Sequence, residues 1–356
     1  MQASLKHPNF TSAILEWYRI HQRDLPWRGS RDPYAVWLSE IIMQQTRVAQ
    51  GTPYYRRFLE RFPEVSDLAT ASEEEVLKLW QGLGYYSRAR NLHAAARKVA
   101  FEWGGKFPES YKGLLELPGV GPYTAAAIAS ICFELPHPVV DGNVFRVLSR
   151  YFDVDIPVDT GPGRRHFDQL AREVMDPGQI GRYNQALMEF GALQCVPANP
   201  DCASCPLVQS CGAHAAGTIG QRPVKQGKTR IRKRYFHYVM PIGPDLQTLL
   251  IRRGGPGIWQ GLYEFPLLEQ EADPTPAEIG ALITTHCGTR TTIGTITRFN
   301  DAPRVHKLSH QHLYTTFWLA RAEGLPEGAL PLSEAEELPV PVLIAEFMDT
   351  VKNSYF

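Results

Sequence analysis

Four of the six cysteines lie within residues 195–211, which is the strongest indication of chemistry in the sequence. They are Cys195, Cys202, Cys205 and Cys211, separated by six, two and five residues. A short loop with this spacing can direct four thiolates at one bound group, so the stretch predicts a cofactor site. Both an iron–sulfur cluster and a Cys₄ zinc ion use four thiolates, and the spacing leaves both open. We expect no disulfide, because thiols stay reduced inside cells.

A second candidate site is residues 114–130, LLELPGVGPYTAAAIAS. Gly119 and Gly121 allow a tight turn and a close backbone approach. The free amides and the dipole at the start of the following helix suit a DNA phosphate. The pattern is typical of a helix–hairpin–helix, although an ordinary turn between two helices can have the same sequence.

An acid, Asp141, follows twenty residues after Gly121 and lies between two valines and the pair Gly142-Asn143. An aspartate in this setting is a candidate active-site group. Seen alone, Asp141 or Asn143 would more often be a helix cap.

The elements that must position these residues fall into two classes. Residues 1–212 place apolar side chains three and four apart in successive segments, which predicts a mainly helical domain. Ser12 and Ser72 stand where helix N-caps are expected. Residues 213–231 have few large apolar side chains and predict an interdomain linker. From residue 232 onwards, short segments rich in β-branched and aromatic residues predict strands, with helices at 275–286 and 342–351, so residues 232–356 predict an α+β domain.

Composition limits the classes of protein without choosing among them. The 356 residues suggest two or three domains. Residues 1–230 carry 26 Lys and Arg against 23 Asp and Glu, and residues 231–356 carry 11 against 14, so the charges balance overall. This asymmetry is too weak to indicate a nucleic-acid partner. No run of about 18 apolar residues predicts a membrane span, and no secretion signal is recognisable, so we expect a cytoplasmic protein.

The hairpin, the aspartate and the cysteine loop, in this order, resemble the endonuclease III superfamily of helix–hairpin–helix glycosylases. The resemblance implies that all four cysteines hold one 4Fe–4S cluster, which shapes the loop and supports DNA contact rather than bond breaking. Lys225, Lys228 and Arg230 follow the loop and would meet phosphates or form a solvated linker. The lone Cys132 and Cys287 are expected to be packing residues.

Position 123 separates the members of this superfamily. Lyases of the endonuclease III type carry a lysine after the hairpin, whereas this sequence has Tyr123. Without that amine, no Schiff base is expected, which predicts a monofunctional glycosylase. Residues 25–28 (LPWR), 37–46 (WLSEIIMQQT) and 82–91 (GLGYYSRARN) resemble the MutY-type adenine DNA glycosylases.

The resemblance implies a site with two carboxyl groups. Glu40 stands among apolar residues that would raise its pKa, so it can protonate N7 of adenine and later assist water. Asp141, as a carboxylate, would stabilise the oxocarbenium ion of the sugar. Tyr123 and Asn143 would hydrogen-bond around these two acids.

The resemblance also implies the residues that hold the DNA. Trp27 and Arg28 would line the adenine pocket. The flipped adenine leaves a gap in the duplex, which inserted residues must fill. The residues implied for this insertion are Gln45 and Tyr85, with Thr46 and Leu83 close by. The expected partner is double-stranded DNA with adenine opposite 8-oxoguanine or guanine, bound by a monomer that is nucleoid-associated when on DNA.

Residues 258–266, IWQGLYEFP, resemble the start of the Nudix-like domain of the same family. The glutamate-rich metal helix of a working Nudix hydrolase is missing, which predicts recognition rather than pyrophosphate hydrolysis. Ser309 and His310 match the pair that the family uses to read 8-oxoguanine, but Leu308 replaces the preceding phenylalanine.

Three alternatives stay open. They are an endonuclease III-like lyase on oxidised pyrimidines, a non-catalytic iron–sulfur DNA-binding protein and a nucleotide pyrophosphatase.

Overall fold

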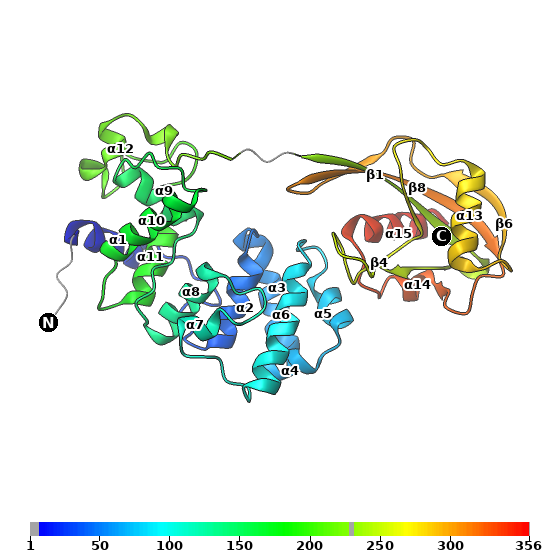
Figure 1. Ribbon diagram of the computed structural model, residues 1–356, viewed down its shortest axis with the longest axis horizontal. Coiled ribbons are helices and arrows are strands. Elements are labelled where there is room, and N and C mark those ends of the chain that lie inside the picture. Colours follow the sequence, from blue (N-terminus) through cyan, green and yellow to red (C-terminus); the bar gives the residue numbers. More distant parts are fainter. Residues whose placement is uncertain (1–6, 228–230, 356) are drawn as a thin grey trace. The chain divides into compact units, whose positions relative to one another are not determined.

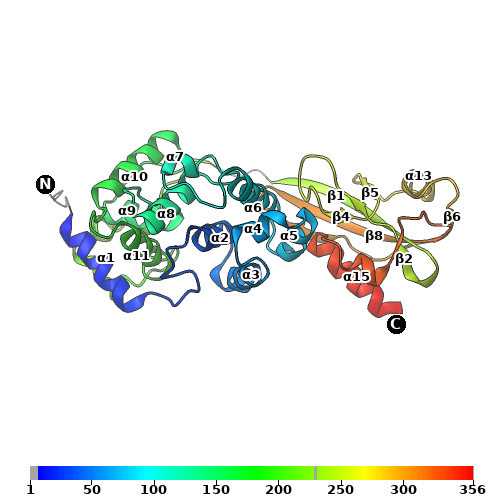
Figure 2. The same ribbon diagram turned by 90° about the horizontal axis from the view of Figure 1, so that it is seen from below.

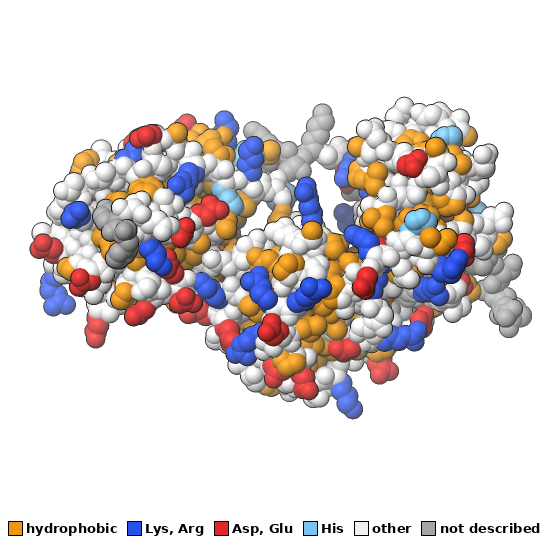
Figure 3. All heavy atoms as spheres, turned by 180° about the vertical axis from the view of Figure 1, so that it is seen from behind, with side chains coloured by type: hydrophobic (Ala, Val, Ile, Leu, Met, Phe, Trp, Pro, Cys, Tyr) orange, Lys and Arg blue, Asp and Glu red, His pale blue; other side chains and the backbone are white. Residues whose placement is uncertain are grey.

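The computed structural model describes residues 7–227 and 231–355, and the chain divides into two compact units (Figure 1). Unit 1 comprises residues 1–70 and 91–227, and unit 2 comprises residues 71–90 and 228–356. In the described part of the chain, no helix is both long and apolar enough to cross a membrane. Acidic and basic side chains are interspersed over the face drawn in Figure 3.

Unit 1 is built from helices, as predicted. The helices are α1 (Pro8–His21), α2 (Pro33–Met43), α3 (Val48–Arg61), α4 (Val65–Thr70), most of α6 (Ser87–Arg97) with the π-turn Lys98–Glu102, α7 (Tyr111–Leu114), α8 (Pro122–Phe133), α9 (Gly142–Tyr151), α10 (Gly161–Glu173), α11 (Ile180–Leu193) and α12 (Gly212–Ala215). Helix α8 is buried over Thr124–Ile131 and packs against both α2 and α11 (Figure 2). Helix α11 also packs against α1 and α9, so α8 and α11 form the centre of the unit.

The predicted hairpin joins α7 to α8. Gly119 has φ +77°, and a Cβ there would lie 2.8 Å from the Cβ of Asn91. Both the left-handed backbone and the lack of space therefore require glycine at this position. Gly121 is the N-cap of α8 and Pro122 is its first residue, a position that proline favours.

Unit 2 contains a five-stranded sheet among the described residues. Strands β5 (Leu267–Glu269), β1 (Arg232–Ile242), β8 (Gln311–Glu323) and β6 (Thr292–Arg298) lie in that order, and β7 (Arg304–Lys307) also pairs with β8. Strands β1 and β8 are parallel, and the other pairs are antiparallel. Short pairs join β2 (Gln247–Thr248) to β9 (Leu330–Pro331) and β3 (Ile251–Arg252) to β4 (Tyr263–Glu264).

Two helices cover opposite faces of this sheet. Helix α13 (Pro276–Cys287) places Ile279 and Ile283 in one apolar core with Val239 and Ala320. Helix α15 (Val342–Tyr355) places Phe347 against Phe317 on the other face, with ring centroids 4.0 Å apart. Helices α5 (Glu73–Trp80) and α14 (Leu332–Ala335) complete the unit. The predicted fold class, a helical domain followed by an α+β domain, is confirmed.

The structure differs from the sequence prediction at two boundaries. Residues 213–231 were predicted as a linker, but unit 1 extends to Gly227, because the Val158 amide donates to Val224 (3.0 Å) and Asp159 accepts from the Gln226 amide (3.0 Å). Residues 71–90 were assigned to the helical domain and instead belong to unit 2. Ser72 caps α5 as predicted, whereas Ser12 lies inside α1.

Candidate active site

Glu40 lies near the end of α2, and the local sequence explains its placement. Asp32 caps this helix by accepting hydrogen bonds from the amides of Tyr34 (3.1 Å) and Ala35 (3.2 Å). The helix then buries an apolar face that includes Trp37. Glu40 itself is partly buried and lines a cavity of about 40 Å³. The cavity is lined by Trp27, Arg28, Val36, Ser39, Glu40, Ile131, Gln185 and Met188.

Burial raises the pKa of Glu40 to about 7. A hydrogen bond from Tyr123 and the positive charge of Arg28 lower this pKa, while the negative charge of Asp141 raises it, so burial is the dominant effect. Glu40 is therefore substantially protonated near neutral pH, as a general acid requires.

Tyr123 follows directly after the hairpin, as the second residue of α8. Its hydroxyl hydrogen-bonds with Glu40 and approaches the sulfur of Met188 at 3.6 Å. Burial and the two nearby carboxyl groups hold the pKa of Tyr123 well above its usual value, so the phenol stays protonated and can donate. The hairpin thus places a hydrogen-bond donor beside the acid.

Asp141 is the N-cap of α9, which is the common role of an aspartate at the start of a helix. Its Oδ1 accepts from the amides of Asn143 (2.9 Å) and Val144 (2.8 Å), and its Oδ2 accepts from Nδ2 of Asn143 (2.7 Å). Burial raises the pKa of Asp141, and these three donors oppose that rise because they stabilise the carboxylate.

A chain of hydrogen bonds links Asp141 to the cysteine loop. Arg146 donates from Nη2 to Oδ1 of Asn143 (2.9 Å) and from Nε to the carbonyl of Cys195 (2.6 Å). The approach of α11 to α9 leaves no room beside Asn143. A Cβ on Gly191 would lie 2.7 Å from the Cβ of Asn143.

Five residues of the cavity wall were not predicted, namely Val36, Ser39, Ile131, Gln185 and Met188. They lie on α2, α8 and α11 at helical spacings that resemble ordinary core packing, so no local signal identifies them. Glu189, which follows Met188, holds Arg28 through a 2.7 Å ion pair and Arg23 through a 2.6 Å ion pair. Hydrogen bonds and charges from these arginines lower the pKa of Glu189 to about 2 against the opposing effect of burial. The carboxylate of Glu189 therefore fixes Arg28 at the cavity wall.

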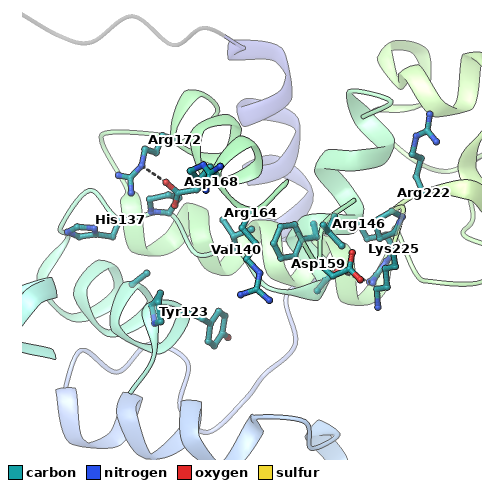
Figure 4. Close-up of a pocket in the computed structure, with 18 of the residues that line it drawn as sticks. Tyr123, His137, Val140, Arg146, Asp159, Arg164, Asp168, Arg172, Arg222 and Lys225 are labelled. Carbon is teal, nitrogen blue, oxygen red and sulfur yellow. Dashed lines mark hydrogen bonds and ion pairs between the residues drawn. The ribbon is translucent and has the colours of Figure 1, made fainter. Parts of the chain in front are cut away.

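A larger cavity of about 1200 Å³ also lies in unit 1 (Figure 4). Its lining includes Tyr123, Val140, Gly142 and the exposed Gln45, which has φ +55° just after α2. Figure 4 shows Arg164 extending into it, and the exposed Lys225 is also on its wall. The wall of this cavity therefore includes both cationic side chains and residues next to Asp141. Thr46 follows Gln45 and donates to the Gln44 carbonyl at 3.3 Å, whereas Lys228 and Arg230 lie outside the described residues.

The four cysteines follow α11 and come together. Burial, together with the charges of neighbouring thiols, raises the pKa of Cys202, Cys205 and Cys211, and Cys195 is one of those neighbours. The four thiols are therefore within electrostatic range of one another. The buried Arg150 approaches Sγ of Cys195 at 3.5 Å and donates to the carbonyls of Val196 (2.7 Å) and Pro197 (2.9 Å). Of the residues described, no group of three His, Cys, Asp or Glu side chains could hold a metal ion. Four thiols beside a buried guanidinium nevertheless suit an anionic four-thiolate cluster in their donor chemistry.

The predicted recognition residues lie in unit 2. Leu308, Ser309 and His310 form the turn between β7 and β8, closed by a hydrogen bond from the Leu308 amide to the Gln311 carbonyl (2.8 Å). Ser309 and His310 are exposed, and the Ser309 hydroxyl contacts that of Tyr85. Tyr85 is 43% exposed with φ +47°, whereas Leu83 is buried.

Two family models match the chain. Residues 38–170 match the model described as HhH-GPD superfamily base excision DNA repair protein, and residues 237–350 match the NUDIX domain. The first match begins within α2, ends within α10 and includes α5, and the second begins within β1 and ends within α15.

Curated relatives and solved structures give consistent similarities. An adenine DNA glycosylase from Buchnera aphidicola subsp. Baizongia pistaciae is 34% identical over 86% of this chain and 84% of that protein. One from Mus musculus is 45% identical over 63% of this chain, and the match spans less than half of that protein (45%). A thermostable thymine-DNA glycosylase structure matches with a TM-score of 0.55 and 31% identity, covering 59% of this chain and 97% of that one.

Proposed function

This chain belongs to the family of the adenine DNA glycosylases, and from that premise we propose that it removes adenine from double-stranded DNA in base excision repair. The observation that carries the proposal is the environment of Glu40. A carboxyl group with a pKa of about 7 lines a small cavity, beside a phenol and within electrostatic range of Asp141.

In the proposed reaction, Glu40 transfers its proton to N7 of the flipped adenine. Protonation makes the base a better leaving group, so the N-glycosidic bond breaks and the bonding electrons leave with the base. Positive charge then develops on the sugar. Water adds to C1′, and the ionised Glu40 accepts the proton that the water loses.

Asp141 is the carboxylate that stabilises the positive sugar. Its three donors hold it in one orientation and favour its ionised form. Tyr123 holds Glu40 in place through its hydrogen bond. Since Tyr123 occupies the position where a lyase carries its amine, we propose hydrolysis without an efficient strand-cleaving step.

We propose that the four cysteines hold a 4Fe–4S cluster and that Ser309 and His310 read 8-oxoguanine or guanine opposite the adenine. When bound, the cluster would fix the fold of its loop. Arg146 would then connect that loop to Asn143 and Asp141. The monomeric state and the nucleoid association remain predictions.

Single-turnover release of adenine tests the proposal, with matched duplexes that pair adenine with 8-oxoguanine or with guanine. Glu40→Gln should slow release by roughly 10²- to 10⁴-fold, because the acid is lost while the shape is kept. Glu16→Gln is the control, since Glu16 is exposed and pairs with Arg19 on the surface. Equal rates in Glu40→Gln and wild type would refute the assignment.

A borohydride assay tests the absence of a lyase step. Stoichiometric trapping of the protein on DNA would favour a lyase. Lesion binding by the wild type without any base release would favour a non-catalytic DNA-binding protein.

A further inference from the structure

One face of the sheet in unit 2 extends beyond the helix that covers it. Val239 and Ala320 lie under α13 on this face. Side chains alternate between faces along a strand, so positions 233 and 235 of β1 share the face of Val239. The strand register adds positions 312 and 314 of β8 and positions 305 and 307 of β7. We call this set of six residues the basic face. It consists of Lys233, Tyr235, Val305, Lys307, His312 and Tyr314.

The basic face carries a row of cationic and titratable side chains across three strands. Lys233 is directly opposite His312, and His312 is directly opposite Lys307. Both lysines are exposed, and their backbones are about 10 Å apart, or two strand spacings.

Aromatic rings lie immediately next to the row. Tyr235 and Tyr314 stack with their centroids 5.1 Å apart, and Nζ of Lys233 lies 5.9 Å from the ring of Tyr314. Val305, which pairs with Tyr314, is 46% exposed. Tyr235 and Tyr314 are half-buried, and cations beside such aromatic rings are typical of nucleic-acid surfaces.

The segments that carry the basic face contain no acidic residues, although residues 231–356 carry more acid than base. Residues 231–235 and 304–315 contain no Asp or Glu. Glu269 is on the neighbouring strand, but it pairs with Arg234, whose side chain alternates to the opposite face. Of the residues that the structure describes, no carboxylate forms an ion pair with Lys233 or Lys307.

The row is also continuous with the predicted recognition turn. Lys307 precedes Ser309 by two residues and His312 follows His310 by two. A polyanion on the basic face would therefore lie against the side chains that are proposed to read a base. A nucleic-acid strand carries phosphates and bases next to each other, so one strand can contact both the lysines and the turn.

We propose that Lys233 and Lys307 bind phosphates of the DNA strand that carries the base opposite adenine. This inference rests on the proposed function, since it takes DNA as the partner. The basic face fixes the position of that strand while the Ser309-His310 turn contacts the base. The two lysines set the affinity for duplex DNA and leave the bond-breaking step unchanged.

The test compares the double variant Lys233→Gln/Lys307→Gln with wild type, both as the full chain. The probe is a duplex in which the sugar of the target adenine nucleotide carries a 2′-fluorine, which resists hydrolysis, so that binding is measured alone. Each phosphate contact contributes about 0.9 to the slope of log Kd against log salt. The double variant should lower that slope by about two and bind roughly 10- to 100-fold more weakly at 0.1 M salt.

Two controls make the result specific. Arg321→Gln removes an exposed cation at the other end of β8 and should leave the slope unchanged. Lys233→Arg/Lys307→Arg keeps both charges and should restore the wild-type slope. Thermal unfolding of each variant verifies the fold.

The inference is overturned if the double variant keeps the wild-type slope, or if Arg321→Gln lowers it equally. It is also overturned if only single-stranded DNA binding falls. Failure of the proposed function gives a different result, because the wild type would then release no adenine whatever the salt slope.

Discussion

Glu40 and Asp141 show how two carboxyl groups in one site acquire different roles. Burial raises the pKa of Glu40 to about 7, although a hydrogen bond from Tyr123 lowers it. Asp141 is also buried, but three donors at a helix N-terminus stabilise its charge. Local donors, rather than burial, therefore separate the acid from the carboxylate.

The pH dependence of adenine release should reflect these two groups. Glu40 must be protonated to act, so the single-turnover rate should fall as pH rises through about 7. Asp141 must be ionised, so the rate should also fall on the acid side, where that carboxyl becomes protonated. Glu40→Gln should lose the alkaline limb of the profile. A wild-type rate that is flat between pH 6 and 8 would contradict this assignment.

Glu189 should contribute to stability through its two arginines. Its folded pKa of about 2 lies below its ordinary value of 4.5, so the stabilisation is present above pH 4.5 and is lost as pH falls towards 2. Glu189→Gln leaves Arg28 without its carboxylate and should cost about 3 kcal/mol in urea unfolding at pH 7. Glu16→Gln, at an exposed ion pair, should leave the stability close to that of wild type.

At the scale of elements, the sequence predicts individual helices and strands better than it predicts how they pack against one another. Apolar periodicity predicts the helices of unit 1, and Gly119 and Gly121 predict the hairpin because glycine permits the tight turn between its two helices. Strand β7 was missed, since RVHK has no alternation of apolar and polar residues. Gln185 and Met188 were missed because their role depends on how α11 packs against α8, which no local pattern contains.

Gly191 should be essential where α11 meets α9. Gly191→Ala would place a methyl group 2.7 Å from the Cβ of Asn143, so one of the two helices must shift. We expect a loss of about 1–3 kcal/mol in unfolding free energy and slower adenine release, since Asn143 holds Asp141. Gly220→Ala is the matched control, because a Cβ there meets nothing within 4 Å. A fully active Gly191→Ala variant of wild-type stability would show that Asn143 is not held by this contact.

At the scale of the whole molecule, the chain does not divide in sequence order. Residues 71–90 belong to unit 2 together with residues 228–356. Their helical pattern predicted the secondary structure of α5 correctly and gave no indication of its partner. The reason is physical, because an amphipathic helix specifies that one face must be covered but does not specify which segment covers it.

Removal of residues 231–356 should therefore destabilise α5 specifically. In the intact chain, Tyr263 donates to Glu74 (3.0 Å), Lys78 donates to Leu338 (3.4 Å) and Arg90 donates to the Gln260 carbonyl (2.7 Å). Truncation removes the partners of these hydrogen bonds, so Glu74, Lys78 and Arg90 bind water instead. It also exposes apolar side chains such as Leu77, which is fully buried in the intact chain. Amide hydrogen exchange should then lose protection over Glu73–Trp80, because local opening costs less where buried contacts are few. Protection of α8 serves as the internal control, and equal protection of α5 before and after truncation would show that it does not depend on the C-terminal residues.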